Sequence, residues 1–142
     1  MKTYILKDID ENITEQVGLL LKKLDPSSPI VDEERLKFLV DDQYFTLFIS
    51  EEDGVISGML TLIRCSTLAR DKFWIEDVVV DQRYRGRGIG RQLVQAAVEY
   101  VRENGCRSTI YLTSNPSRTA ARALYRSEGF DEYDTGVFRM TV

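Results

Sequence analysis

The stretch VVVDQRYRGRGIGR, residues Val78–Arg91, joins three valines to a loop rich in glycine and arginine. Consecutive valines indicate a strand that is buried on both faces. Beyond the loop, apolar side chains recur at every fourth position from Ile89 to Val101, which predicts an amphipathic helix over Gly88–Asn104. A strand that leads into a helix through a glycine loop is typical of a site for a negatively charged ligand.

The loop itself suits a phosphate or a pyrophosphate. Glycines let successive backbone N–H groups point at one spot, and the helix N-terminus adds its partial positive charge. A Walker loop is excluded because no Lys-Ser or Lys-Thr follows the glycines. A dinucleotide-binding Gly-x-Gly-x-x-Gly fails because its last glycine would be Arg91 or Leu93. What remains is Arg-x-x-Gly-x-Gly, filled by Arg85, Gly88 and Gly90.

Charge is unevenly distributed along the chain. The 142 residues predict a single domain over 1–142, with a net charge of −4. The segment Arg83–Arg126 has nine arginines and two glutamates, a net +7, which leaves −11 for the rest. We therefore expect a local polyanion site rather than a nucleic-acid-binding surface.

Several functional classes are excluded by composition. The chain has no histidine, so histidine-based catalytic triads and histidine metal sites are absent, and no metal is predicted. Early charges argue against a signal peptide, and no apolar run approaches the roughly 18 residues of a membrane span. We expect a cytoplasmic protein with no membrane contact, in which Cys65 and Cys106 are buried, reduced thiols.

Outside Val78–Arg91, periodicity predicts further elements on both sides. The expected order is β-α-α-β-β-β-α-β-α-β, with a parallel pair and a right-handed crossover in the middle. The expected strands are Thr3–Ile9, Tyr44–Ser50, Val55–Arg64, Phe73–Val80, Ser108–Thr113 and Val137–Val142, and the other helices are Asn12–Leu24, Asp32–Val40 and Ser117–Glu128.

The motifs resemble those of the GNAT superfamily of N-acetyltransferases. The resemblance rests on the valine strand, on Arg85-x-x-Gly88-x-Gly90, and on Ala123-Leu124-Tyr125-x-x-x-Gly129-Phe130, in that order. It implies an α/β fold: a mixed, mostly antiparallel sheet of six to seven strands, flanked by about four helices, with a central β-α-β crossover.

The resemblance also implies a role for each matching position. The loop would hold the pyrophosphate of acetyl-CoA, the valine strand would pair with its pantetheine arm, and Ser108–Thr113 would splay from Phe73–Val80 to admit that arm. Tyr125 would give a proton to the departing thiolate. The implied cofactor-binding residues are Val78, Val79, Val80, Arg85, Gly86, Arg87, Gly88, Ile89, Gly90, Arg91, Asn115, Arg118 and Ala121.

Two positions depart from the family pattern. Many members have Asn at the position of Arg118, whereas Asn115 stands earlier here. Protein N-terminal acetyltransferases often have Glu at the position of Thr113. Both departures argue against a direct transfer of protein-acetylating function.

The acetyl acceptor must be a free amine, so the reaction needs a base. Glu76 is the candidate, since strict alternation puts it on one face with Val78 and Val80. The alternative is that Glu76 only pairs with an arginine. Asp77, expected on the opposite face, is the second choice and is more consistent with a structural role.

The predicted function is acetyl transfer from acetyl-CoA to a small primary amine, such as an amino acid or a polyamine, by direct attack in a ternary complex. Acidic residues near the expected acceptor entrance favour a cationic amine, although solvation of helix surfaces explains most of them as well. A protein lysine or N-terminus is the alternative acceptor. A non-catalytic acyl-CoA-binding regulator is the alternative of another class. Asp131–Val142 offers an edge strand at which a homodimer could form.

Overall fold

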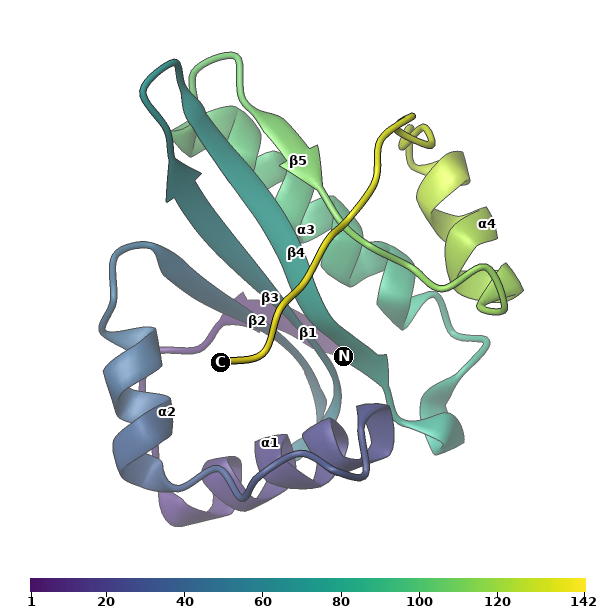
Figure 1. Ribbon diagram of the computed structural model, residues 1–142. Helices are drawn as coiled ribbons and strands as arrows, with labels where there is room; N and C mark the ends of the chain where they lie inside the picture. The colour runs from purple at the N-terminus through teal and green to yellow at the C-terminus, as the bar shows by residue number, and fades with distance from the viewer.

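One mixed sheet of five strands organises the chain (Figure 1). The computed structural model describes residues 1–142. The strand order is β1-β2-β3-β4-β5; the first three pairs are antiparallel, and β4 and β5 are parallel. The elements are β1 Lys2–Ile5, α1 Glu11–Leu24, α2 Glu33–Val40, β2 Phe45–Glu52, β3 Val55–Ser66, β4 Asp71–Val80, the 3-10 turn η1 Gln82–Tyr84, α3 Ile89–Asn104, β5 Thr109–Tyr111 and α4 Thr119–Ser127.

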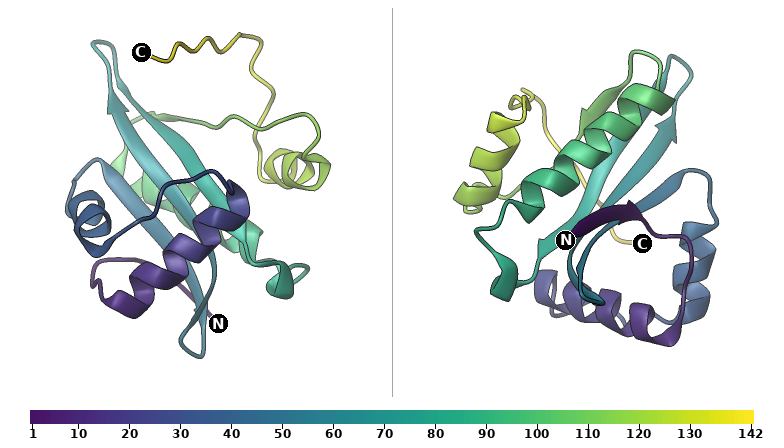
Figure 2. Two further views of the ribbon diagram at one scale, coloured as in Figure 1. Left: turned by 60° about the horizontal axis from the view of Figure 1, so that its bottom comes forward. Right: turned by 180° about the vertical axis from the view of Figure 1, so that it is seen from behind.

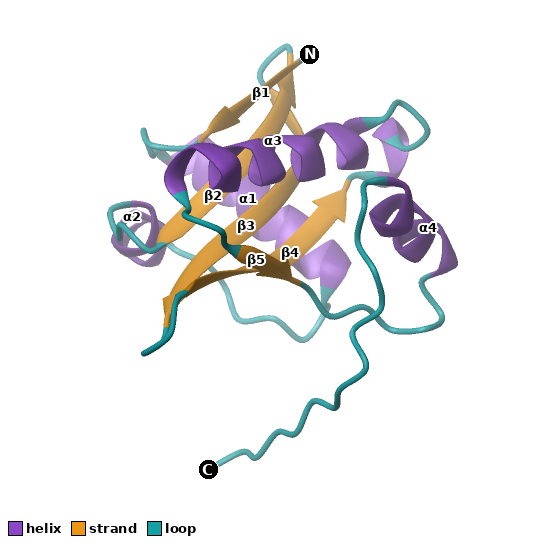
Figure 3. Cartoon of the chain, turned by 90° about the horizontal axis from the view of Figure 1, so that it is seen from above, coloured by secondary structure: helices purple, strands orange, loops and turns teal.

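Helices cover both faces of this sheet. α1 and α2 lie on one face and α3 on the other, while α4 lies beside the first half of α3 (Figures 2 and 3). Each face has its own apolar cluster: Leu60, Leu62 and Leu93 belong to the α3 side, and Leu20 and Met59 to the α1 side. None of the helices is both long and apolar enough to cross a bilayer.

The α3 helix forms as its sequence predicts. Its buried stripe includes Ile89, Leu93, Ala97 and Val101, four residues apart. Burial of a side chain such as Leu93 contributes roughly 1.5–3 kcal/mol. The helix ends at Gly105, whose N–H donates to the carbonyl of Val101 at 2.7 Å. Helix α3, which connects the parallel strands β4 and β5, therefore packs against the core along its whole length.

β4 does not alternate regularly, which corrects one expectation from sequence. Between the pairs Met59↔Val79 and Thr61↔Glu76, β3 advances two residues and β4 advances three. Asp77 takes φ 48°, a left-handed conformation that Asp tolerates better than most residues. This β-bulge puts Glu76 and Asp77 on the same face, that of α1 and Thr61, and leaves Val78 and Val80 on the α3 face.

The sheet has five strands rather than the six to seven expected, because Val137–Val142 forms no strand. No segment of the chain pairs with the outer edge of β5, and a strand needs such a partner. The prediction of buried thiols is also wrong, since Cys65 and Cys106 are both free and exposed. Cys65 lies in the exposed last two residues of β3, and Cys106 lies in the turn after α3.

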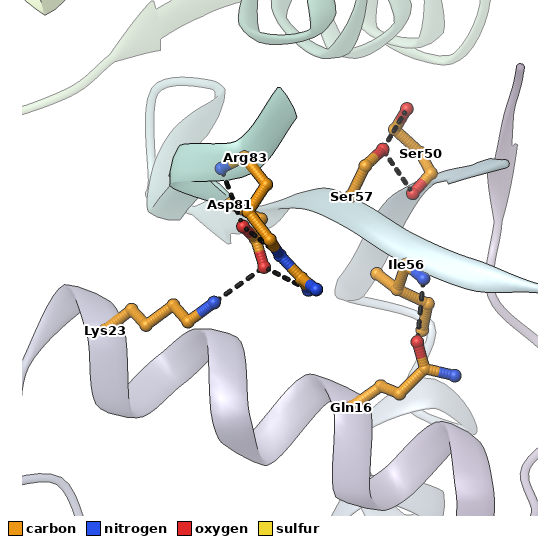
Figure 4. Close-up of polar contacts among 7 residues, drawn as sticks. All are labelled: Gln16, Lys23, Ser50, Ile56, Ser57, Asp81 and Arg83. Atoms are coloured by element: carbon orange, nitrogen blue, oxygen red, sulfur yellow. Dashed lines mark hydrogen bonds and ion pairs between the residues drawn. The ribbon is translucent and has the colours of Figure 1, made fainter. Parts of the chain in front are cut away.

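A buried carboxylate connects α1 to the end of β4 (Figure 4). Asp81 is 3% exposed and accepts hydrogen bonds from Lys23 Nζ at 2.6 Å and from the Arg83 guanidinium at 3.0 Å. It also accepts from the Arg83 N–H, so it caps the η1 turn that leads into the glycine loop. These donors, with Arg83 first, hold the pKa of the Asp81 carboxyl well below its usual range.

Asp81→Asn is expected to lower the free energy of unfolding at pH 7 by about 1.5–3 kcal/mol, the usual value of hydrogen bonds to a charged group. The pKa of Asp81 is lowered on folding, so its contribution is complete above the unfolded pKa of about 3.9 and is lost as pH falls through the folded value. Urea unfolding at several pH values measures this. The difference between wild type and variant should shrink below about pH 4; a difference that is constant with pH would contradict the ionic role.

Candidate active site

The glycine loop presents a row of free backbone donors. None of the N–H groups from Gly86 to Arg91 donates to an acceptor within the chain. Gly86 and Gly88 take φ 81° and 77°, the left-handed conformations that turn successive N–H groups toward one side. Gly88 is also the N-cap of α3 and provides no side-chain cap. The loop and the helix N-terminus together form a suitable cradle for an anion.

Most of the arginine charge predicted at the loop is already paired. Arg83 binds Asp81, Arg87 contacts Glu52 at 3.2 Å, and Arg91 forms an ion pair with Glu128. Arg85 forms no ion pair or hydrogen bond through its side chain. The backbone N–H groups and Arg85 are therefore the groups in the loop that are free to bind a phosphate.

Gly88→Ala is expected to raise the Kd for acetyl-CoA at least tenfold. The added Cβ meets nothing within 4 Å, so the effect comes from the strain of φ 77°, which costs an alanine roughly 1–2 kcal/mol. Relief of that strain moves the N–H groups. Gly18→Ala in α1 is the control: it also meets nothing within 4 Å, and its helical position should make it stabilising by up to about 1 kcal/mol. Calorimetric titration would contradict the prediction if the two variants bound equally well.

A splay between β4 and β5 opens beside this loop. The two strands pair only from Lys72↔Thr109 to Trp74↔Tyr111, so β4 has a free edge from Ile75 to Val80. The N–H of Asp81 points toward β3, where it donates to Ser57 O at 2.8 Å. Because backbone groups alternate in direction along a strand, those of Val78 and Val80 point toward the splay. The divergence predicted from sequence is confirmed.

Two carboxylates lie on the α1 face at the start of that free edge. Asp77 accepts a hydrogen bond from the Thr61 hydroxyl at 3.1 Å, which fixes its position in the bulge. Glu76 has no such partner, and partial loss of hydration followed by the charge of Asp77 raises the pKa of its carboxyl. The alternative in which Glu76 pairs with an arginine is wrong. A carboxyl with a raised pKa is better matched to accept a proton near neutral pH.

Tyr125 lies on α4, on the other side of the splay. Its ring packs against the α3-side cluster and lies edge-on to Phe130 at 6.1 Å. Burial raises the pKa of its hydroxyl, and the charge of Arg118 offsets part of that rise. The hydroxyl therefore keeps its proton at neutral pH and can donate it. A close contact positions α4 here, since a Cβ on Gly90 would lie 3.3 Å from the Leu124 side chain.

The remaining predicted cofactor residues surround the start of α4. Asn115 accepts hydrogen bonds from the N–H and the hydroxyl of Ser117 at 2.9 and 2.8 Å, so its side chain holds the turn before the helix. Arg118 is the exposed N-cap of α4, and Ala121 is half-buried one turn before Tyr125.

Sequence reasoning missed an aromatic pair beside Glu76. Trp74 lies two residues before Glu76 on the α1 face and stacks on Tyr111 with ring centroids 5.0 Å apart. Tyr133 approaches Tyr111 at 6.0 Å. The sequence signal that could have revealed this pair is that Trp74 stands on the same strand as the candidate base Glu76, two residues away.

Three of the six acids expected at the acceptor entrance have local structural roles. Asp32 caps α2 by accepting from the Arg35 N–H, Asp25 accepts from Ser27, and Asp42 accepts from the Tyr44 N–H. No group of three or more acidic or thiol side chains that could hold a metal is present. The carboxylates Glu76 and Asp77, at the start of the free edge of β4, form an acidic pair next to the splay.

Comparison with known proteins agrees with this geometry. The model of the acetyltransferase (GNAT) family matches residues 14–130. Glucosamine 6-phosphate N-acetyltransferase 1 of Oryza sativa subsp. japonica is 31% identical over 126 residues, which cover 80% of this chain and 72% of the relative. The chain belongs to the acetyltransferase (GNAT) family and is an acetyl-CoA-dependent N-acetyltransferase.

Solved structures share the fold. An aminoglycoside acetyltransferase, meta-AAC0020, from an uncultured soil metagenomic sample superposes with a TM-score of 0.87 at 23% identity, over 99% of this chain and 95% of that chain. AAC(6')-Iy in complex with a CoA bisubstrate analogue superposes with a TM-score of 0.78 at 22% identity, over 100% and 99% of the two chains.

Proposed function

We propose that this acetyltransferase acetylates a primary amine of a small cationic molecule by direct attack in a ternary complex. The observation that carries the proposal is the position of Glu76. This carboxyl has a raised pKa and stands at the bulge where β4 leaves β5, on the face opposite α3. A base at that point would lie next to the thioester of an acetyl-CoA molecule whose arm runs from the glycine loop through the splay.

Acetyl-CoA would bind along β4. The N–H groups of Gly86–Arg91 would hold its pyrophosphate, and the outward backbone groups of Val78 and Val80 would pair with the pantetheine arm as an added strand does. Asn115, Arg118 and Ala121 would border that arm from the side of α4. The pyrophosphate and pantetheine parts of this assignment rest on unpaired backbone donors and on a free strand edge in the chain.

The proton transfers would use one group on each side of the splay. An alkyl amine with a pKa of about 10 must lose a proton at pH 7, at a cost of roughly 4 kcal/mol, and Glu76 accepts it directly or through water. The nitrogen then attacks the thioester carbon, the carbon–sulfur bond breaks, and the departing thiolate takes a proton from Tyr125. The attacking nitrogen gives up its second proton as the amide forms, and this proton restores Tyr125 through water, while Glu76 releases the first proton to solvent. An ammonium ion and a thioester thus yield an amide, a thiol and one proton.

The α1 face of the sheet beside Glu76, where the acceptor would bind, favours a small amine with a flat apolar side. Trp74 and Tyr111 offer a stacked wall next to the two carboxylates, which would attract an ammonium group. The rice relative is named for an amino sugar phosphate and meta-AAC0020 for aminoglycosides, so amino sugars join amino acids and polyamines as candidates.

The test is release of free thiol from acetyl-CoA against a panel of amines. The panel contains amino acids, polyamines, amino sugars and aminoglycosides, with lysine peptides and peptides with free N-termini as the protein arm. Turnover with a small cationic amine supports the proposal. Turnover with peptides alone would replace it with protein acetylation, and acetyl-CoA binding without thiol release on any amine would replace it with a regulator.

A further inference from the structure

Three side chains of β4 form a row on the α1 face of the sheet. The strand pairs with β3 in unbroken register from Lys72 to Glu76. Side chains alternate along such a strand, so Lys72, Trp74 and Glu76 share one face. Phe73 and Ile75 lie on the other face, in the α3-side cluster. The row therefore has a cation at one end, an aromatic ring in the middle and a carboxylate at the other end.

The cation at the start of the row is unpaired. Lys72 is half-buried, and its side chain forms no ion pair or hydrogen bond. Its Nζ lies 5.6 Å from the centre of the Tyr111 ring, the ring that stacks on Trp74. The contact holds the ammonium group beside the aromatic pair, and its three N–H groups remain free to donate. An ammonium group that is partly dehydrated and unpaired is well suited to bind an anion.

The opposite end of the row is negative. Glu76 and Asp77 both lie on the α1 face at the bulge, and neither forms an ion pair. Four residues of extended strand put about 13 Å between the Cα atoms of Lys72 and Glu76, and both side chains can lean inward. One small molecule can therefore place an ammonium group at Glu76 and an anionic group at Lys72 at the same time.

The helices leave this row accessible. Val79 is the member of β4 in the α1-side cluster, and Trp74 lies outside that cluster. The ion pair of Lys23 with Asp81 fixes α1 at the end of β4, away from the start of the strand (Figure 1). Glu76 is exposed, so a ligand can approach the row from solvent.

We propose that Lys72 binds an anionic group of the acceptor, a phosphate or a carboxylate, while the amine of the same molecule lies at Glu76. The inference rests on the proposed function and narrows its acceptor class to amines with an anionic group at the far end. Trp74 and Tyr111 would flank the part of the molecule between the two charges. A polyamine would instead bring a second ammonium group to Lys72, where like charges repel.

Binding can be followed without turnover, because Trp74 is the single tryptophan of the chain and its fluorescence reports on the row. The protein, saturated with CoA, is titrated with two matched pairs of amines: glucosamine 6-phosphate against glucosamine, and ε-aminocaproate against its amide. The anionic member of at least one pair should bind at least tenfold more tightly, and the pair that responds distinguishes phosphate from carboxylate. Equal affinities within both pairs, or no response to either anion at millimolar concentration, would overturn the proposal.

Lys72→Met tests the assigned side chain. Met keeps an apolar stem against Tyr111 and removes the charge, so the Kd of the anionic amine should rise at least tenfold while that of its neutral partner stays the same. Lys7→Met is the matched control: Lys7 is an exposed, unpaired lysine that follows β1, at the other edge of the sheet. It loses the same charge and should bind like the wild type. Equal affinities for the two variants would overturn the role of Lys72.

Thiol release separates this inference from the proposed function. Equal kcat/KM values for the anionic and neutral amines, unchanged in Lys72→Met, would overturn the inference and leave acetylation of a small amine in place. An anion-dependent fluorescence response that is lost in Lys72→Met, without turnover of any small amine, would support the anion site and overturn the proposed function.

Discussion

Glu76→Gln is expected to lower kcat by about 10²–10⁴-fold, the usual contribution of a positioned general base. Gln keeps the size of the side chain and cannot accept the proton of the ammonium group. The defect should shrink as pH rises toward about 10, where the amine loses its proton without help. Steady-state rates between pH 6 and pH 10 measure this. A defect that is the same at every pH would assign Glu76 a binding role instead.

Asp77→Asn is the matched control for that variant. Asn tolerates φ 48° and can still accept a hydrogen bond from Thr61, so the bulge should remain. The charge of Asp77 raises the pKa of Glu76, and its removal therefore lowers that pKa. In the proposed mechanism the ionised form of Glu76 accepts the proton, so the acidic limb of the rate profile should move to lower pH while kcat near neutral pH stays close to that of the wild type.

Tyr125→Phe is expected to lower kcat at least tenfold with little change in the Kd for acetyl-CoA. The ring keeps its packing against Phe130 and the α3-side cluster. The departing thiolate, the conjugate base of a thiol with a pKa of about 8.5, loses its proton donor. Single-turnover rates and calorimetric titration separate the two effects.

Tyr100→Phe is the control for Tyr125→Phe. Tyr100 is also half-buried against the α3-side cluster, where it lies edge-on to Phe48 at 5.9 Å, and it lies outside the splay. Its loss of a hydroxyl should leave kcat unchanged. Equal rates for Tyr125→Phe and the wild type would remove Tyr125 from the proton transfers.

The parts of the site that the sequence predicted are those with local signals. The α3 helix and its glycine loop follow from a four-residue apolar period and from glycines that can take positive φ. The pattern of Val137–Val142 also predicts a strand, but strand pairing depends on an edge that the segment does not reach within its own chain. Local pattern thus predicts the type of element more reliably than its partner.

The faces of β4 could not be read from alternation. A single extra residue at Asp77 moves two carboxylates to one face, and an apolar pattern that resumes at Val78 hides this shift. The burial of Asp81, and its ion pairs with Lys23 and Arg83, could not be predicted either, because nothing in the sequence around a single acid near several arginines indicates that it is buried. Both features depend on contacts with β3 and α1, which lie far away in the sequence.

If acetyl-CoA binds along the free edge of β4 as proposed, its binding would contribute to the stability of the folded protein. From Ile75 to Val80 the outward backbone groups of β4 have no neighbouring strand to bind, and a bound pantetheine arm would supply hydrogen bonds to some of them. A ligand that binds only the folded state stabilises it by about 2.7 kcal/mol at one hundred times its Kd. The folded fraction of this enzyme would then rise with the concentration of acetyl-CoA.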